Sequence, residues 1–171
     1  MDKYVELARN TIEKYIRENE VYIPSDDELT DEMKSERAGA FVSIHKLGGL
    51  RGCIGTIAPT RANLAEEIIS NAISASTRDP RFDPIRTDEL ADLEINVDVL
   101  TSPEPIDSPA ELDVKRYGVI VEKGFRRGLL LPDLDGVDTI EEQVAIAKQK
   151  AGLDPNEIGV KLSRFEVIRH V

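Results

Sequence analysis

The stretch LEINVDVL, residues 93–100, decides the fold class of this chain. Apolar and polar side chains alternate along it, which predicts a β-strand with one buried face and one face in water. One-sided burial is typical of antiparallel sheets, because strands of parallel sheets are covered on both faces and are apolar throughout. The sequence therefore predicts an antiparallel sheet.

Two hairpins are predicted on either side of this strand. Residues 39–45 and 50–57 are β-prone runs joined by a double glycine, and residues 118–121 and 128–131 form a second pair. Helices that do not alternate regularly with strands complete the pattern, which indicates an α+β fold, an antiparallel β-sheet flanked by helices. We expect residues 1–171 to form a single domain.

Three helices are predicted from apolar residues at helical spacing. They cover residues 3–20, residues 60–79 with Thr60 as the N-cap, and residues 139–151, which follow a Thr-x-x-Glu capping box and stop at Gly152.

Two segments lack regular periodicity. The acidic residues 25–37 favour a solvated loop over a metal site, because hard cations need convergent oxygens. Near the C-terminus the apolar phase slips between Leu162 and Phe165, which predicts a β-bulge at Ser163-Arg164.

The composition excludes several classes of function. A formal net charge of −11 disfavours nucleic-acid regulators and binding to anionic membranes, and no apolar run approaches the ~20 residues of a membrane-spanning helix. One cysteine cannot form an internal disulfide, and one cysteine with two distant histidines is not a zinc set, so no metal is predicted. Dinucleotide and Walker fingerprints are missing, so no cofactor is predicted. The N-terminus lacks a signal-peptide pattern, and we expect a cytoplasmic protein.

The run LRGCIG, residues 50–55, is the candidate site. Arg51 would favour the thiolate of Cys53, the candidate catalytic nucleophile. Gly52 and Gly55 would let a ligand approach the backbone closely. The alternative is that Cys53 is a small buried residue and that both glycines serve packing. The residues alone leave both interpretations open.

A catalytic cysteine also needs a base, and the chain offers only His45 and His170. A two-residue glycine turn would place Cys53 opposite Ile44 and turn His45 to the other face of the hairpin. This register disfavours a Cys–His dyad.

Arginines near the motif suggest anion binding. The two prolines of residues 78–84 predict a rigid loop that carries Arg81. If folding brings Arg51 and Arg81 beside Gly52 and Cys53, they would form a cleft for carboxylate or phosphate. Alternatively, each arginine pairs with a neighbouring aspartate and fixes the loop.

Five segments together resemble the AMMECR domain family, named after a human chromosomal region linked to Alport syndrome with midface hypoplasia and elliptocytosis. They are GAFVSI (39–44), LRGCIG (50–55), DPRF (79–82), the strand from Leu93, and GLLLP (128–132). They follow the family's order and cover nearly the whole chain. Within DPRF we assign structural roles to Asp79 and Phe82.

The resemblance implies a larger antiparallel sheet with helices beside a smaller lobe, with residues 50–55 near their junction. It implies an archaeal or bacterial member, and it supplies no settled activity. Prokaryotic members often occur with a radical S-adenosylmethionine protein and a Memo-like protein, which suggests shared chemistry on a small substrate.

Two classes of function stay open. In the first, the protein binds a small anionic ligand, alone or as an enzyme subunit, through Arg51, Gly52, Gly55 and Arg81, with Cys53 as nucleophile or adduct site. In the second, it is a noncatalytic protein-interaction module that docks partners through the cleft and the turn at Arg126-Arg127. Whether it is an enzyme, and whether it is a monomer or a homodimer, stays open.

Overall fold

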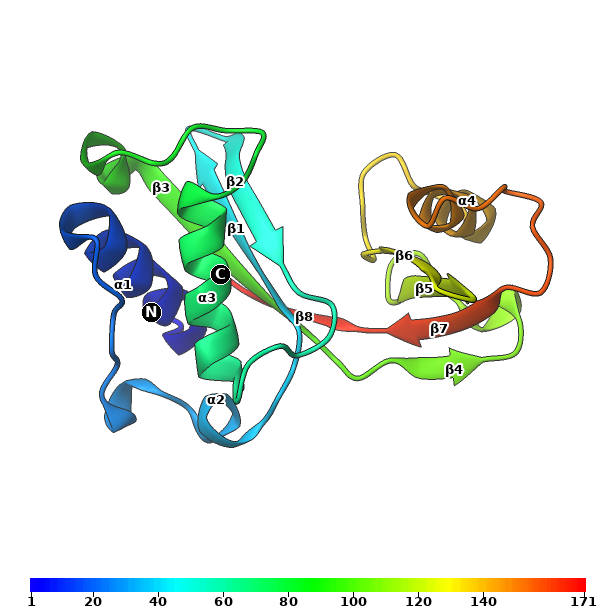
Figure 1. Cartoon of the computed structure of the whole chain (residues 1–171), viewed down its shortest axis with the longest axis horizontal. Coiled ribbons are helices and arrows are strands. Elements are labelled where there is room, and N and C mark those ends of the chain that lie inside the picture. The colour runs from blue at the N-terminus through cyan, green and yellow to red at the C-terminus, as the bar shows by residue number, and fades with distance from the viewer. The chain divides into compact units, whose positions relative to one another are not determined.

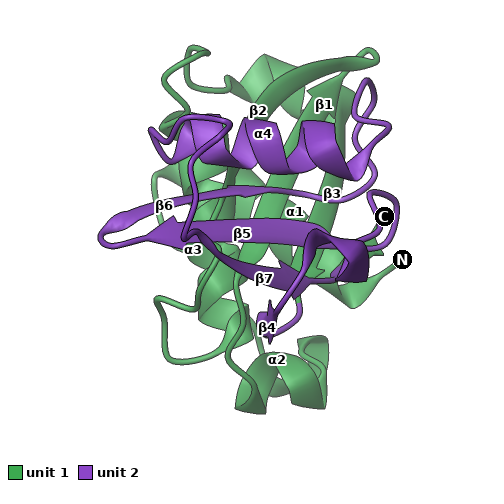
Figure 2. Cartoon of the chain, turned by 90° about the vertical axis from the view of Figure 1, so that its right-hand side faces the viewer, with its two compact units in different colours: residues 1–100, 168–171 green, residues 101–167 purple.

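The computed structural model describes all 171 residues, which divide into two compact units. Unit 1 comprises residues 1–100 and 168–171, and unit 2 comprises residues 101–167 (Figure 2). Each unit has its own four-stranded antiparallel sheet and its own apolar core. The predicted α+β class with antiparallel sheets is confirmed. No helix in the chain combines the length and apolarity needed to cross a bilayer.

Unit 1 contains a sheet with the strand order β2-β1-β3-β8 (Figure 1). Helices α1 and α3 pack against each other and against the strands, while short helices connect the longer elements. The elements are α1 (Lys3–Glu18), η1 (Asp26–Glu28), α2 (Asp31–Ser35), β1 (Ala40–Lys46), β2 (Gly49–Gly55), α3 (Leu64–Thr77), η2 (Thr87–Asp92), β3 (Leu93–Leu100) and β8 (Val167–His170).

Strand β3 has the predicted bounds, residues 93–100. Its apolar side chains are buried with those of α1 and α3 in the core of unit 1. Asp98 departs from the alternation, because it is buried although it lies on the polar face. Its carboxylate accepts hydrogen bonds from Arg169 Nε at 2.8 Å and Nη2 at 3.1 Å, so the charge is neutralised by a bidentate ion pair.

Helix α3 begins later than predicted. Its N-cap is Asn63, whose side chain accepts a hydrogen bond from the backbone N–H of Glu66 at 2.9 Å. Thr60 was the wrong choice, because its hydroxyl and backbone N–H both donate to Glu67 instead. The helix itself and its end before Pro80 are confirmed.

Unit 2 has the strand order β4-β7-β5-β6, with α4 packed against β5 and β6. Its elements are β4 (Glu104–Ile106), η3 (Pro109–Glu111), β5 (Gly118–Lys123), β6 (Arg126–Leu130), α4 (Ile140–Lys150) and β7 (Lys161–Phe165). The predicted second hairpin and third helix are confirmed, with the stop at Gly152, which has a φ of +74°. The predicted capping box is only half formed, because the Thr139 hydroxyl accepts a hydrogen bond from the Glu142 backbone N–H at 3.1 Å but the Glu142 side chain does not bind the Thr139 backbone N–H.

The predicted bulge at Ser163-Arg164 is wrong. Strand β7 pairs with both β4 and β5 in continuous register through these residues. The phase slips because both faces of β7 carry apolar side chains. Leu162 packs in the core that includes α4, whereas Phe165 places its ring over Gly118.

Candidate functional site

The hairpin of β1 and β2 sets the direction of the candidate side chains. Ser43 lies opposite Cys53, so the register predicted from the sequence is wrong by one residue. The tight turn is Leu47-Gly48, both with positive φ, and an irregularity at Arg51 absorbs one extra residue.

Cys53 lies in a row of polar side chains that crosses three strands. Ser43 is the cross-strand partner of Cys53 on one side and of Asn96 on the other, so the three side chains share one face of the sheet. The Cys53 sulfur lies 3.3 Å from the Ser43 hydroxyl, and all three residues are half-buried.

Gly52 points to the opposite face, where α3 packs on β2. A Cβ atom added there would overlap the Ala75 carbonyl oxygen of α3. Only glycine permits this approach, so Gly52 serves packing, and the row of Cys53, Ser43 and Asn96 lies on the helix-free face of the sheet. Gly55 serves packing as well, because the Phe41 ring lies directly over it.

Asp79 and Arg81 hold Cys53 at the free edge of the sheet. Asp79 Oδ2 accepts a hydrogen bond from the Cys53 backbone N–H at 3.0 Å, and Arg81 Nη2 donates to the Cys53 carbonyl at 3.4 Å. Strand β2 is an edge strand, so these side chains form hydrogen bonds with backbone groups that would otherwise be available to pair with another strand. We call this pair of side chains the Asp79–Arg81 latch.

The latch is a tight ion pair. Arg81 Nε and Nη2 donate to the two Asp79 oxygens at 3.0 and 2.7 Å, and the Asp79 side chain is 2% exposed. The Arg81 guanidinium, aided by the backbone N–H groups of Cys53 and Arg81, outweighs burial and holds the pKa of Asp79 well below its usual range. The Arg81 side chain is 56% exposed, and its Nη1 has no acceptor in the protein. Phe82 lies beside the guanidinium, 5.4 Å from ring centroid to Cζ.

Arg51 is engaged by the protein through all three guanidinium nitrogens. Nε and Nη2 donate to the Glu89 carboxylate at 3.0 and 3.1 Å, and Nη1 donates to the Asp83 carbonyl at 2.7 Å. Lys46 Nζ also donates to Glu89 at 3.0 Å. The Arg51 hydrogen bonds, against burial, lower the pKa of Glu89 to about 2. Arg51 thereby ties β2 to the loop before η2.

Neither histidine is hydrogen-bonded to Cys53. His170 Nδ1 lies 2.8 Å from Asp2 Oδ2, and its ring stacks on Tyr4 with centroids 3.8 Å apart. His45 pairs across the sheet with Leu50 and Glu94. No cluster of three or more His, Cys, Asp or Glu side chains could hold a metal ion.

Sequence reasoning missed Glu67, which fixes the chain that leaves β2. Its buried carboxylate accepts hydrogen bonds from the Thr56 and Thr60 hydroxyls and from the backbone N–H groups of Thr60 and Arg61, all within 3.0 Å. Burial opposes ionisation, but these hydrogen bonds outweigh it and lower the pKa of Glu67. The sequence did contain a sign of this role, because Glu67 is a charged residue beside Ile68 on the otherwise apolar face of a predicted helix.

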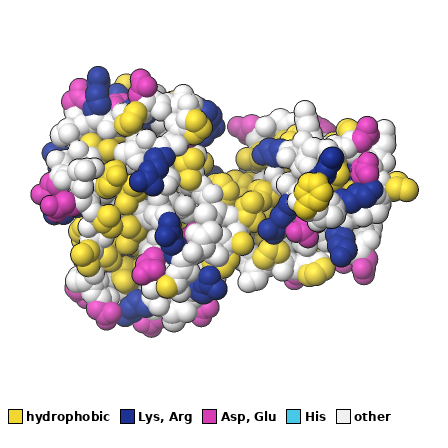
Figure 3. Space-filling model, viewed as in Figure 1, with side chains coloured by type: hydrophobic (Ala, Val, Ile, Leu, Met, Phe, Trp, Pro, Cys, Tyr) yellow, Lys and Arg dark blue, Asp and Glu magenta, His cyan; other side chains and the backbone are white.

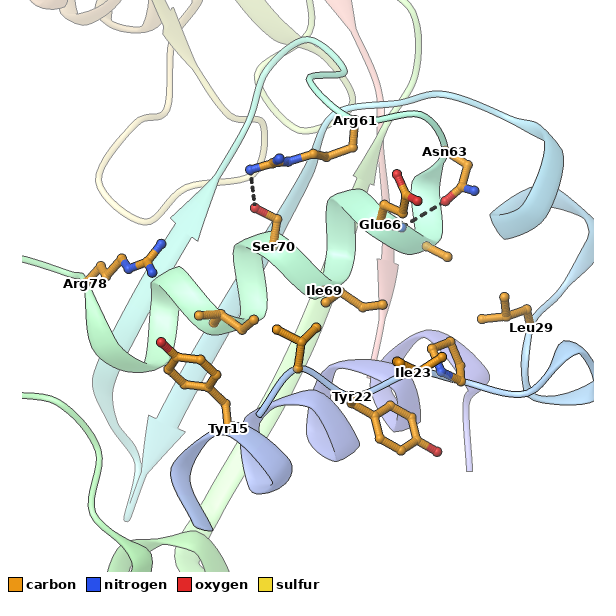
Figure 4. A pocket seen from close by; sticks show the side chains of 14 residues that line it. Tyr15, Tyr22, Ile23, Leu29, Arg61, Asn63, Glu66, Ile69, Ser70 and Arg78 are labelled. Atoms are coloured by element: carbon orange, nitrogen blue, oxygen red, sulfur yellow. Dashed lines mark hydrogen bonds between the residues drawn. The ribbon is translucent and has the colours of Figure 1, made fainter. Parts of the chain in front are cut away.

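A second feature, an apolar groove, was also missed. It has a volume of about 650 Å³ and lies along α3, between that helix and the chain that follows α1 (Figure 4). Its lining combines Tyr15, Val21, Tyr22, Ile23, Pro24, Leu29, Ala65, Ile69 and Ile73 with Arg61, Asn63, Glu66, Ser70 and Arg78. Figure 3 shows apolar side chains gathered over this side of unit 1.

The fold and the site define a class of two-unit α+β proteins in which one half-buried cysteine is held at a sheet edge by an Asp–Arg ion pair. The chain belongs to the AMMECR1 family, whose sequence model matches residues 5–170.

Relatives match nearly the whole length of the chain. A Thermotoga maritima protein is 54% identical over 168 residues, which are 98% of this chain and 96% of that protein. A Clostridium acetobutylicum protein is 49% identical over 169 residues, 99% of this chain but 36% of that protein. The crystal structure of an uncharacterised protein from Pyrococcus horikoshii is similar, with a TM-score of 0.86 and 36% identity over 97% of this chain and 88% of that one.

Proposed function

We propose that this protein binds a small anionic ligand on the helix-free face of the first sheet, beside Cys53, Ser43 and Asn96. The observation that carries the proposal is the state of Arg81. Its guanidinium is fixed by Asp79 and touches the Cys53 backbone, yet it is more than half exposed and keeps Nη1 without a protein acceptor. A fixed, partly unpaired guanidinium suits a carboxylate or phosphate. In this proposal Gly52 and Gly55 act by packing.

Arg51 contributes mainly by positioning. Its donors are taken by Glu89 and by loop carbonyls, so it fixes the strand that carries Cys53. Binding comes before catalysis in this proposal, because neither histidine reaches the thiol. In this proposal the Cys53 sulfur contacts the ligand, and a role for Cys53 as a nucleophile is secondary.

The test compares two reagents that alkylate the only cysteine, the anion iodoacetate and the neutral iodoacetamide. Arg81 should raise the iodoacetate rate relative to the iodoacetamide rate. The ratio of the two rates cancels differences in thiol ionisation and exposure between variants. We expect Arg81→Gln to lower this ratio about threefold or more, by loss of one nearby charge, and Arg81→Lys to lower it less.

Arg86→Gln is the matched control, because Arg86 is exposed and follows in the same loop. It should leave the ratio unchanged. A ratio that is the same in the wild type and in Arg81→Gln, or a thiol that reacts only after denaturation, would overturn the proposal.

A protein-interaction role is favoured by the tip of the β5–β6 hairpin. Phe125 is 96% exposed there and precedes Arg126 and Arg127. In line with the family resemblance, we propose cytoplasmic partners, a radical S-adenosylmethionine protein and a Memo-like protein, that dock at this tip. Co-purification should survive Cys53→Ser and fail in Phe125→Ser/Arg127→Glu. Co-purification that persists in the hairpin variant would remove this docking role.

A further inference from the structure

The groove along α3 lies on the helical side of unit 1, away from the Cys53 row. We infer that it is a docking site for an amphipathic, acidic-flanked helix of a partner protein. The inference is independent of the ligand site proposed above.

The apolar part of the groove is left open by the fold. Ile23 is 86% exposed and Val21 is 54% exposed, on the chain that leaves α1. Ile69 and Tyr15 are half-buried and face the same hollow from α3 and α1 (Figure 4). Several large apolar side chains around one trough of this size make a surface that association would cover.

The two arginines that line the groove have no carboxylate partner within the protein. Arg78, the C-cap of α3, is exposed, and its side chain has no hydrogen-bond or ion-pair partner. Arg61 donates from Nη2 to the Ser70 hydroxyl at 3.1 Å and has no carboxylate partner. In a chain with a net charge of −11, two arginines on one rim that both lack a carboxylate indicate a partner that brings its own.

The geometry sets the spacing of those carboxylates. The Arg61 guanidinium lies beside Ser70, eight residues before Arg78 along the helix (Figure 4). At 1.5 Å per residue this is about 12 Å, or about two helical turns. Acidic side chains about two turns apart on one flank of a helix would face both arginines, while its apolar stripe fills the trough.

The groove also contains one acidic residue, Glu66. Its carboxylate accepts a hydrogen bond from the Ala62 backbone N–H at 3.3 Å and makes no ion pair with Arg61. Glu66 therefore stabilises the start of α3, and the cationic rim is formed by Arg61 and Arg78.

A polypeptide occupant also agrees with one relative, whereas the matched region is 96% of the Thermotoga maritima protein. The matched region is 36% of the Clostridium acetobutylicum protein, so a homologous domain there works beside much additional chain. The lining of the groove runs from Asn63 to Arg78, the two caps of α3, a helix of 14 residues and about 21 Å, which suits a partner helix of about four turns.

The test selects peptides from a displayed library against the full-length protein. Each library member is a helix of about four turns with a fixed apolar stripe, and two flank positions two turns apart are varied among Glu, Lys and Ser. We expect selection to enrich Glu at both flank positions. The best peptide is then titrated by fluorescence anisotropy against groove variants.

The Arg78→Glu variant should bind this peptide about tenfold more weakly than the wild type does. The same variant should bind more tightly to a peptide with Lys at the facing position, because the charge pair is then restored with reversed sign. Ile23→Glu should weaken both peptides. Ile23 is exposed, and the Arg78 side chain makes no hydrogen bond or ion pair, so each variant should keep the wild-type unfolding transition in urea.

Matched controls are Arg17→Glu, an exposed arginine of α1 outside the groove, and Ile158→Glu, an 82% exposed isoleucine of unit 2. Both should bind like the wild type. Equal loss in the controls, or enrichment of Lys or Ser on the flank, would overturn the inference.

Two further measurements test two other occupants of the groove, a membrane and a second copy of this chain. Sedimentation with phosphatidylcholine–phosphatidylserine vesicles that is lost in Ile23→Glu and Arg78→Glu would assign the groove to a membrane. Self-association that is lost in the same variants by sedimentation equilibrium would assign it to a second copy. Either result without peptide binding overturns the helix-docking inference.

Discussion

Replacing Arg51 with methionine should expose how strongly the candidate site depends on its buried ion pair. The Glu89 side chain is 7% exposed and that of Arg51 is 16% exposed, so the pair is shielded from water. The pKa of Glu89 is lowered from 4.5 to about 2, first by the Arg51 hydrogen bonds and against burial. At about 1.4 kcal/mol for each tenfold change in ionisation, this corresponds to about 3 kcal/mol at neutral pH.

Arg51→Met should therefore lower the free energy of unfolding by about 2–3 kcal/mol at pH 7. Lys46 and the Arg86 backbone N–H still bind Glu89 and retain part of the stabilisation. Three of the four tyrosines lie in unit 1 and the chain lacks tryptophan, so tyrosine fluorescence in urea reports mainly on this unit.

The pH dependence supplies a second readout. Because the folded-state pKa of Glu89 is lowered, its contribution is fully present above about pH 4.5 and is lost as the pH falls toward about 2. The variant should lose less stability than the wild type over that range. Arg86→Met removes a 75% exposed guanidinium that lies 3.3 Å from Asp88 and 4.0 Å from Glu89, and it should change stability by less than about 0.5 kcal/mol because the pairs are in water. A cost below about 1 kcal/mol for Arg51→Met, or identical pH profiles, would refute the reasoning.

Other substitutions test the packing and the loop that surround the site. Gly52→Ala should cost about 3 kcal/mol or more, because the added methyl group meets a carbonyl of α3, whereas Gly49→Ala, with its nearest neighbour 3.7 Å away, should cost under about 1 kcal/mol in the same urea experiment. Glu67→Gln should cost about 2 kcal/mol, since an amide offers one acceptor oxygen in place of two, and hydrogen exchange should rise in residues 56–61 while β3 stays protected. Gly128→Ala should destabilise unit 2 alone, seen as faster exchange in β5 and β6 with unit 1 unchanged.

Local sequence patterns predicted most elements of both units. The alternation of residues 93–100 predicted β3 with its bounds, and apolar residues at helical spacing predicted α1, α3 and α4. The predicted positions of a turn and of a helix N-cap were wrong where two neighbouring residues could each have filled the role. A Gly-Gly pair suggested a turn one residue too late, and Thr60 resembled an N-cap although Asn63 three residues on was better placed.

The sequence named some residues of the proposed site, but not Ser43 or Asn96 and not the partners of the charged side chains. The sequence could name Cys53, Asp79 and Arg81, because an unusual motif and a rigid Pro-rich loop draw attention to them. That Asp79 binds the Cys53 backbone depends on contacts between residues 26 positions apart, which no local pattern specifies. The pairing of Arg51 with Glu89, 38 residues away, is of the same kind.

The sequence by itself determined the α+β class, the approximate places of the longer strands and helices and the family of this protein, because these follow from periodicity, turn residues and motif order along the chain. Only the tertiary structure decided which arginine is left with a free donor and where an apolar groove stays open. Both depend on which side chains meet across the fold. Arg51 is paired with Glu89, Arg81 keeps Nη1 unpaired, and Arg78, in the lining of the groove, is left without a partner.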